Sequence, residues 1–298
     1  MKLSARIVGT TVGPLTQAID ARWLMAYAAA LGETDARYFD TRGALVAHPL
    51  FPVCYEWPAA VAARERSIPT AVYARVVHAT HDLKIHRLPR AGDTLHTSAQ
   101  IVGAAQRTPG AFVVTRMETR DAAGELVSVT DNGSLYRDVA LDGAERNGGP
   151  GPDEAQAPNA LLPPVGEVAV PATLAHVYTE CARIWNPIHT DLTTAGAAGL
   201  PGLILHGTAT LALSVSKVLA AFGDDPARVR RVRCRFTGMV PMPSVLKVRA
   251  VRMDSTESTE STESTDRMAR TRHAGSTTLF ETASAGTTVI QRGAIDLV

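Results

Sequence analysis

Apolar and polar positions in the first half of the chain follow a helical spacing first and a strand-like spacing afterwards. Stretches at 22–32 and 55–67 carry apolar residues at helical intervals, so we expect a helix in each. Four strand-like runs follow, at 72–86, 94–104, 111–121 and 125–139. Turn residues separate the runs, which favours antiparallel neighbours joined by short connections.

The second half shows the same order of patterns. Helical spacing occurs at 175–186 and again at 206–223, where Gly223 is placed to end the second helix. Four strand-like runs come after it, at 228–240, 245–253, 277–284 and 287–298. Each half therefore predicts helices followed by an antiparallel sheet, an α+β arrangement with the helices on one face.

Two segments interrupt these patterns. Residues 141–164 are rich in Gly, Pro, Ala and acidic residues and lack apolar periodicity, so we expect a linker between domains 1–140 and 165–298. The length of 298 residues agrees with two domains. Residues 255–266 read STESTESTESTD, a repeat with no apolar residue, and we expect a solvated hairpin tip there.

The two halves also align with one another as an internal repeat. The spacing between matched positions is about 151 residues and grows to 158 for one pair of histidines, as a single loop insertion would produce. The matched pairs are Glu33 with Ile184, Asp35 with Asn186, Tyr38 with His189, His48 with His206, and Gly92 with Pro243. Two copies of one unit are expected to share an extended sheet.

Charge and composition exclude several classes of protein. With 30 Lys and Arg against 29 Asp and Glu, the net charge of +1 disfavours a nucleic-acid or membrane-surface partner. The three cysteines form no CxxC pair, and no signal peptide or membrane span is evident, so we expect a cytoplasmic protein. No glycine-rich nucleotide motif is present, and we expect no cofactor.

The candidate chemistry lies in the second half. Asn186, Pro187 and His189 form an Asn-Pro-x-His run, and His206-Gly207 stands at the head of the predicted helix 206–223. This pattern resembles the signature of the MaoC-like hydratase 2 family. The run HATHDLKIHRLPRAGDTL in the first half resembles the dehydratase-type domain that accompanies it. The resemblance implies a double hotdog, in which two tandem hotdog domains wrap an antiparallel sheet around long helices.

The resemblance also implies an activity, the reversible hydration of a trans-2-enoyl thioester to a 3-hydroxyacyl thioester. The substrate is expected to be carried on CoA or on a carrier protein. His189 is then the acid/base, and Asn186 orients groups in its loop. The backbone N–H of Gly207 stabilises the charge that develops on the thioester oxygen.

One residue departs from this pattern. The family has an Asp five residues before the His, where this chain has Ile184. Either another carboxylate compensates, with Glu33 and Asp191 as candidates, or the protein is a non-catalytic acyl-CoA-binding protein or an inactive partner subunit. A thioesterase is a third, less favoured possibility, because hotdog folds host that chemistry too.

Secondary candidates complete the expected site. His206 is expected to order the helix start and contact the substrate, and Arg233 and Arg235 are expected to lie together near a CoA phosphate. His78 and His81 are expected to point to opposite faces of a strand, so we expect no metal site there. A homodimer is possible on symmetry grounds, although the sequence does not establish one.

Overall fold

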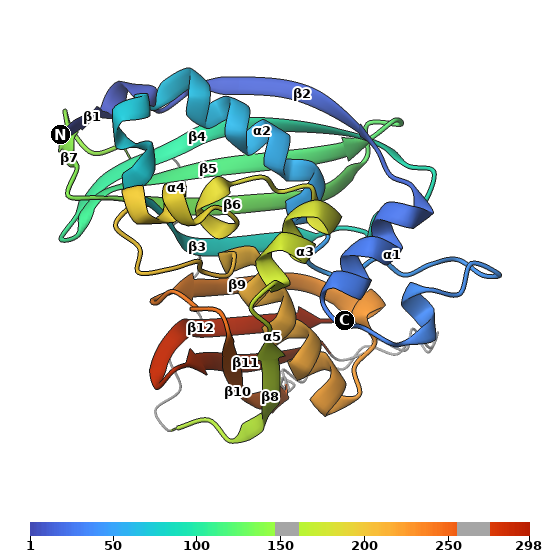
Figure 1. The fold of residues 1–298 in the computed structure, drawn as a ribbon. Helices are drawn as coiled ribbons and strands as arrows, with labels where there is room; N and C mark the ends of the chain where they lie inside the picture. The colour runs from blue at the N-terminus through green and yellow to red at the C-terminus, as the bar shows by residue number, and fades with distance from the viewer. Residues whose placement is uncertain (147–160, 255–274) are drawn as a thin grey trace, which may run out of the picture.

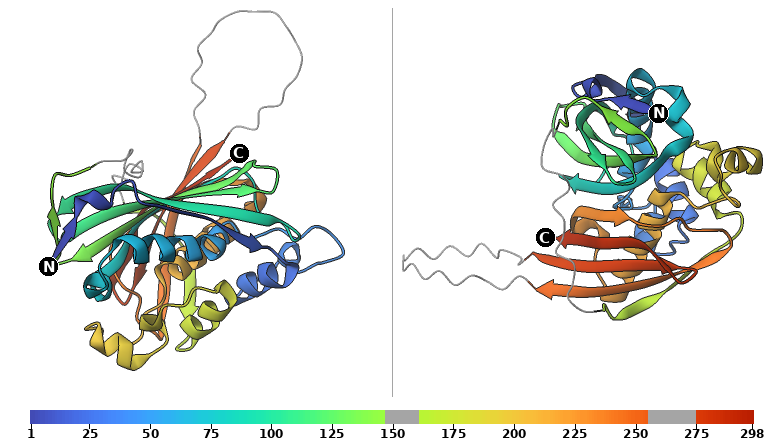
Figure 2. Two further views of the ribbon diagram at one scale, coloured as in Figure 1. Left: turned by 90° about the horizontal axis from the view of Figure 1, so that it is seen from above. Right: turned by 90° about the vertical axis from the view of Figure 1, so that its left-hand side faces the viewer.

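The computed structural model describes residues 1–146, 161–254 and 275–298. The predicted hairpin tip at 255–266 and most of the predicted linker lie outside these ranges, so the proposed domain limits remain predictions. Among the described residues, no helix combines the length and the apolarity needed to cross a bilayer. The fold is shown from three directions (Figures 1 and 2).

One antiparallel sheet of ten strands runs through the whole molecule (Figure 1). Its strand order is β2-β4-β5-β6-β3-β9-β12-β11-β10-β8, so β3 and β9 join the two halves at the centre. The first-half strands are β2 Thr11–Ala18, β3 Val76–Ile85, β4 Thr94–Arg107, β5 Gly110–Asp121 and β6 Leu126–Arg137. The second-half strands are β8 Pro164–Val170, β9 Val229–Phe236, β10 Ser244–Asp254, β11 Ser276–Ser284 and β12 Thr287–Leu297.

The order confirms the predicted repeat. Reading outward from the β3–β9 junction gives β3, β6, β5, β4 and β2 on one side and β9, β12, β11, β10 and β8 on the other. Each strand thus has a counterpart at the same distance from the junction. The short 3₁₀ helices Ala36–Tyr38 and Pro187–His189 are 151 residues apart, as the aligned pairs require. The shared sheet agrees with the expected α+β double hotdog.

The helices lie on one side of this sheet (Figure 2). The long helices are α2 Pro52–Ser67 and α5 Gly207–Phe222, one for each half, and the shorter ones are α1 Ala21–Ala30, α3 Leu174–Ala182 and α4 Leu192–Ala197. Helix α5 ends where expected, because Gly223 adopts the left-handed conformation with φ 67°. Helices α1 and α3 pack against each other, and Tyr27 and Tyr178 meet there with ring centroids 5.8 Å apart.

The sheet extends further than the sequence patterns indicate. Strands β2 and β8 were not predicted, and they form the two opposite edges. Their residues are mostly exposed or half-buried, and Pro14 interrupts β2, which an edge strand tolerates. A second sheet pairs the three-residue strands β1 Lys2–Ser4 and β7 Ala140–Asp142. Strands of this length give no periodic signal.

The central junction joins the halves through one hydrophobic core. The largest cluster of buried apolar side chains takes members from α1, α2 and β3 as well as from α3, α5 and β9. Beside it, Arg231 of β9 donates two hydrogen bonds of 2.7 Å to Asp82 of β3. Because the core is continuous, a cavity at the junction can be lined by both halves.

Candidate active site

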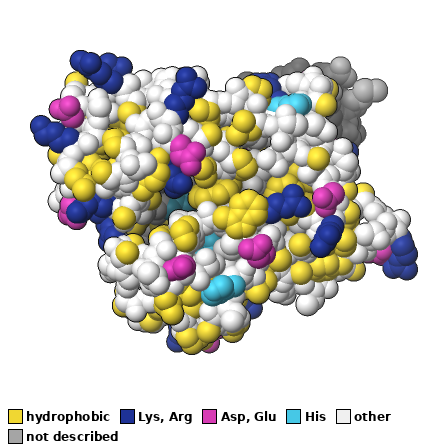
Figure 3. Space-filling model, turned by 45° about the horizontal axis from the view of Figure 1, so that its top comes forward, with side chains coloured by type: hydrophobic (Ala, Val, Ile, Leu, Met, Phe, Trp, Pro, Cys, Tyr) yellow, Lys and Arg dark blue, Asp and Glu magenta, His cyan; other side chains and the backbone are white. Residues whose placement is uncertain are grey.

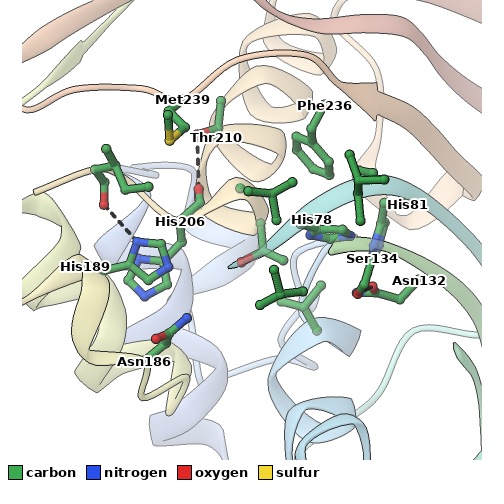
Figure 4. A pocket seen from close by; sticks show the side chains of 18 of the residues that line it. His78, His81, Asn132, Ser134, Asn186, His189, His206, Thr210, Phe236 and Met239 are labelled. Carbon is green, nitrogen blue, oxygen red and sulfur yellow. Dashed lines mark hydrogen bonds between the residues drawn. The ribbon is translucent and has the colours of Figure 1, made fainter. Parts of the chain in front are cut away.

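A cavity of about 570 Å³ lies at this junction. Its walls come from α2, β3, β5 and β6 of the first half and from the 184–189 loop, α5, β9 and the 237–240 loop of the second half. The volume lies in the range typical of sites for small organic ligands. Hydrophobic side chains gather across this face of the molecule (Figure 3). The labelled polar residues converge on the cavity from several elements (Figure 4).

His189 is fixed in this cavity by a single hydrogen bond. Its Nδ1 lies 2.9 Å from the carbonyl oxygen of Ile204, which can only accept, so Nδ1 carries the proton. The neutral ring therefore has an unprotonated Nε2. Burial lowers the pKa of His189 to about 4, since desolvation disfavours the charged ring. The result is a neutral imidazole of defined tautomer, which can accept a proton at one nitrogen.

His206 stacks directly on His189. The two ring centroids are 3.7 Å apart with an interplanar angle of 27°, and His206 Nε2 lies 3.1 Å from the hydroxyl of Thr179. Burial, and then the neighbouring His189, lower the pKa of His206 to about 2. Burial thus favours the neutral form of both rings, and His206 packs directly against His189.

Asn186 and Gly207 border the same space. Asn186 precedes the 3₁₀ helix that carries His189, and its side chain lies below the two histidine rings (Figure 4). Gly207 is the first residue of α5, so its N–H has no partner within the helix and lies at the positive end of the helix dipole. A Cβ on Gly207 would lie 3.7 Å from Nδ1 of His78, another residue that lines the cavity. The N-terminus of α5 therefore borders the cavity. The predicted residues His189, Asn186, His206 and Gly207 are thus brought together.

The two predicted compensating acids lie elsewhere. Ile184 lines the cavity and is 4% exposed, but neither Glu33 nor Asp191 is among the lining residues. Oε1 of Glu33 lies 3.9 Å from Nε2 of His48, which is the first-half counterpart of His206. Asp191 accepts a hydrogen bond from the Thr194 N–H and caps α4 at the surface. Their placement gives no support to either residue as a substitute for the missing Asp.

The carboxyl group that does line the cavity is Glu56 of α2, which sequence reasoning missed. It is 1% exposed, and burial raises its pKa to about 8. The hydroxyls of Ser128 and Thr130 donate to its Oε1 at 3.0 and 2.9 Å. A carboxyl held between strands and a helix from distant parts of the chain leaves no local sequence signal; only its position within an apolar helical stretch was unusual.

His78 and His81 correct another expectation. They were expected on opposite faces of β3, but their rings meet edge to face with centroids 5.4 Å apart, and both line the cavity. The register of β3 against β6 shifts between His78 and Thr80, and this bulge adds the extra residue that turns both side chains the same way. No group of three or more metal-ligating side chains occurs among the described residues.

The two arginines of β9 have separate positions. Arg233 lies 2.5 Å from Asp296 of β12 and does not line the cavity, so the structure does not bring it to a ligand. Arg235 does line the cavity, next to the exposed residues 237–239, which mark an opening. Of the predicted pair, Arg235 alone is positioned to meet a negatively charged group entering there.

Comparison with protein families gives one match for each half. Residues 6–130 match the family described as FAS1-like, dehydratase domain region. Residues 168–273 match the family described as MaoC like domain. The two matches lie on either side of the predicted linker; the second covers the second-half wall of the cavity, and the first covers the first-half wall except the lining residues of β6.

Among curated proteins, the chain resembles peroxisomal multifunctional enzyme type 2 of Drosophila melanogaster, with 31% identity over 179 residues. That alignment covers 59% of this chain and 30% of the fly enzyme. The mouse enzyme of the same name is 28% identical over 55% of this chain and 22% of its own length. The aligned segments thus span less than a third of the length of each of these relatives.

Solved structures agree on the fold. A MaoC-like dehydratase from Phytophthora capsici has a TM-score of 0.79 and 22% identity, covering 97% of this chain and 95% of that one. Full-length peroxisomal multifunctional enzyme type 2 from Drosophila melanogaster has a TM-score of 0.69 and 22% identity, over 97% and 48% of the two chains. A Mycobacterium tuberculosis protein described as a double hotdog matches with a TM-score of 0.58 and 15% identity, covering 98% of this chain and 96% of its own. The fold is therefore a double hotdog.

Proposed function

Since this chain joins a FAS1-like dehydratase region to a MaoC-like dehydratase domain, we propose that it is a hydro-lyase. Its reaction is the reversible hydration of a trans-2-enoyl thioester to a 3-hydroxyacyl thioester. The observation that carries the proposal is the position of His189. Its Nδ1 is bound to the Ile204 carbonyl, and its Nε2 is left as a base in a cavity that the N-terminus of α5 borders.

The site residues have complementary roles in this proposal. A water held by Nε2 of His189 adds its oxygen to C3 of the enoyl group, and His189 takes the proton that the water loses. The π electrons of the double bond move toward C2 and onto the thioester oxygen. The N–H of Gly207 stabilises this negative charge, aided by the dipole of α5.

The imidazolium of His189 then returns a proton to C2, so the neutral imidazole is restored and the water is fully added. Stacked His206 keeps the ring in position through both transfers. Asn186 orients the water or the thioester from below the rings. General acid–base catalysis of this kind contributes a factor of roughly 10²–10⁴ to the rate.

The substrate carrier and location form part of the same proposal. Arg235 at the cavity opening fits the phosphates of CoA, as it would fit those of a carrier-protein arm. The three cysteines of the chain are unpaired, in agreement with the expected cytoplasmic location. A homodimer remains a prediction.

One observation favours a second candidate, an acyl-CoA-binding protein without catalysis. Ile184 occupies the position of the family Asp inside the cavity, and neither Glu33 nor Asp191 replaces it there. His189 would then only hydrogen-bond to the bound thioester.

Loss of enoyl absorbance with crotonyl-CoA and with trans-2-decenoyl-CoA decides between the two candidates. For the hydro-lyase we expect turnover that His189→Ala abolishes, while the affinity for a saturated acyl-CoA is kept. Binding of acyl-CoA without turnover of either enoyl substrate would contradict the hydro-lyase and leave the binding protein. If neither the enoyl-CoA substrates nor the saturated acyl-CoA bind, both candidate functions are contradicted.

A further inference from the structure

The cavity wall contributed by the first half carries a cluster of polar side chains among its apolar ones. His78 and His81 of β3, Asn132 and Ser134 of β6, and Glu56 of α2 all line it. In Figure 4, His78 lies between the His189–His206 stack on one side and His81, Asn132 and Ser134 on the other. A pocket for a plain hydrocarbon chain would be lined by aliphatic side chains there, because burying unpaired polar groups against a methylene chain is costly.

His81 is the strongest part of this observation. It is 1% exposed, and neither ring nitrogen has a hydrogen-bond partner among the described residues. Nε2 of the adjacent His78 is also buried and has no hydrogen-bond partner among the described residues. An unsatisfied buried donor or acceptor costs about 1–3 kcal/mol, so such groups in native proteins usually meet a water or a ligand.

The chemistry of the wall defines what would satisfy it. Burial lowers the pKa of His81 to about 4, so the ring is neutral and offers one donor and one acceptor. Ser134 donates to Oδ1 of Asn132 at 3.3 Å, which leaves the amide N–H groups of Asn132 as further donors. The Asn132 amide and one nitrogen of His81 are donors on this wall, and their complement is an oxygen atom that accepts hydrogen bonds.

We propose that this polar wall, formed by His78, His81, Asn132 and Ser134, binds an oxygen substituent carried by the acyl chain beyond the reacting C2–C3 bond. The substituent is a hydroxyl, keto or carboxylate oxygen, so the substrates are oxygenated acyl thioesters rather than plain fatty acyl thioesters. The inference rests on the proposed function, because it takes the cavity as the acyl site with its thioester at Gly207.

Binding measurements test the inference without relying on catalysis. Butyryl-, octanoyl- and dodecanoyl-CoA are titrated calorimetrically beside their ω-hydroxy and ω-carboxy analogues. At the chain length that reaches the polar wall, we expect one oxygenated analogue to bind about tenfold tighter than its methyl-ended counterpart. The analogue that gains most identifies the substituent.

Variants locate the preference. Ser134→Ala and Asn132→Ala remove polar groups from half-buried positions, and each is expected to reduce the preference severalfold while the methyl-ended analogue binds as before. His81→Phe is expected to reverse the preference, because the methyl end of the acyl chain then contacts an apolar wall. Met117→Leu, at a buried lining position on β5, is the matched control that should keep the preference.

Each outcome separates this inference from the proposed function. A tenfold preference without hydration of any enoyl-CoA supports the polar wall and contradicts the hydro-lyase. Hydration of plain enoyl-CoA, with methyl-ended analogues bound as tightly as oxygenated ones at every length, contradicts the polar wall alone. Failure of every acyl-CoA to bind contradicts both.

Discussion

The two halves of the molecule carry corresponding sites whose histidines differ in the surroundings of their ring nitrogens. In the first half, His48 accepts from the Leu50 N–H at Nδ1 and lies 3.0 Å from the Ser216 hydroxyl at Nε2, so both nitrogens are occupied. Its aligned partner His206 stacks on His189, whose Nε2 faces the cavity.

The aligned residues explain this difference. Tyr38 stands where His189 stands, and its ring lies 6.1 Å from His48 rather than stacking on it. Glu33 stands where Ile184 stands and approaches His48 to 3.9 Å. The first-half site thus has a carboxylate and a tyrosine at these two positions, whereas the second-half site has an isoleucine and a histidine. The comparison assigns the proposed chemistry to the half whose histidine has a nitrogen facing the cavity, and four predictions test this assignment.

The largest expected effect is the contrast between His189→Ala and His48→Ala. Removing His189 should lower kcat for enoyl-CoA hydration by roughly 10²–10⁴-fold, because the proposed general base is then gone. Removing His48 should keep kcat per folded molecule but cost about 1–3 kcal/mol of stability, because the Leu50 N–H is left unpaired. Hydration assays measure kcat of both variants, and denaturant unfolding measures their stability. Equal losses of kcat would remove the distinction between the halves.

Ile184→Asp completes the second-half site. A carboxylate beside His189 should raise kcat by about tenfold or more, since it shares the proton transfers with the base. Ile184→Asn, which resembles Asp in shape but cannot transfer a proton at neutral pH, is the control. If Asp and Asn behave alike, this site does not use a carboxylate at that position.

The pH dependence sharpens the comparison further. Burial lowers the pKa of His48 to about 3 and that of His189 to about 4, below the ordinary 6.5. At these two histidines, the unfolded chain therefore binds more protons than the folded one below pH 6.5. The free energy of unfolding should be highest above this pH and fall as the pH drops toward 4, by up to about 1.4 kcal/mol per unit for each histidine.

Equilibrium unfolding between pH 7 and pH 5 measures this loss. In His48→Phe the free energy of unfolding should depend less steeply on pH, because one histidine with a lowered pKa is gone. The pH dependence of turnover should stay that of His189. A slope that the variant leaves unchanged would show that His48 does not contribute to it.

The smallest expected effect comes from Glu33→Gln and Asp191→Asn. Neither side chain lines the cavity, so both variants should hydrate enoyl-CoA within about twofold of the wild type. Asp191→Asn keeps a side chain that can cap α4, and its stability should change little. A large loss of turnover in Glu33→Gln would mean that the first-half site takes part in the chemistry.

Periodicity and motif spacing predicted the larger features of this molecule. The two long helices, the eight internal strands of the large sheet and the repeat between the halves all follow from apolar spacing that local sequence carries. The convergence of His189, His206 and Gly207 also followed, because a motif and a helix start fix their positions. These features depend on contacts within short stretches or on a recognisable pattern.

Other features depend on contacts that no short stretch encodes. The β3 bulge that unites His78 and His81 arises from pairing with β6, and the position of Glu56 depends on Ser128 and Thr130 across the sheet. Arg233 was predicted near a ligand by strand alternation, but Asp296 on the neighbouring strand binds it instead. Such partners are set by sheet register, which a single sequence leaves undetermined.

The pairing of β3 with β9 within one chain has a consequence for how such a site can change over generations. In a symmetric dimer of identical chains, every substitution is made twice, so a residue that improves one wall also alters the catalytic copy. Here each substitution is made once. In the proposed division of roles, one copy can therefore serve as a specificity surface while the other carries the chemistry, and dilution cannot separate the two.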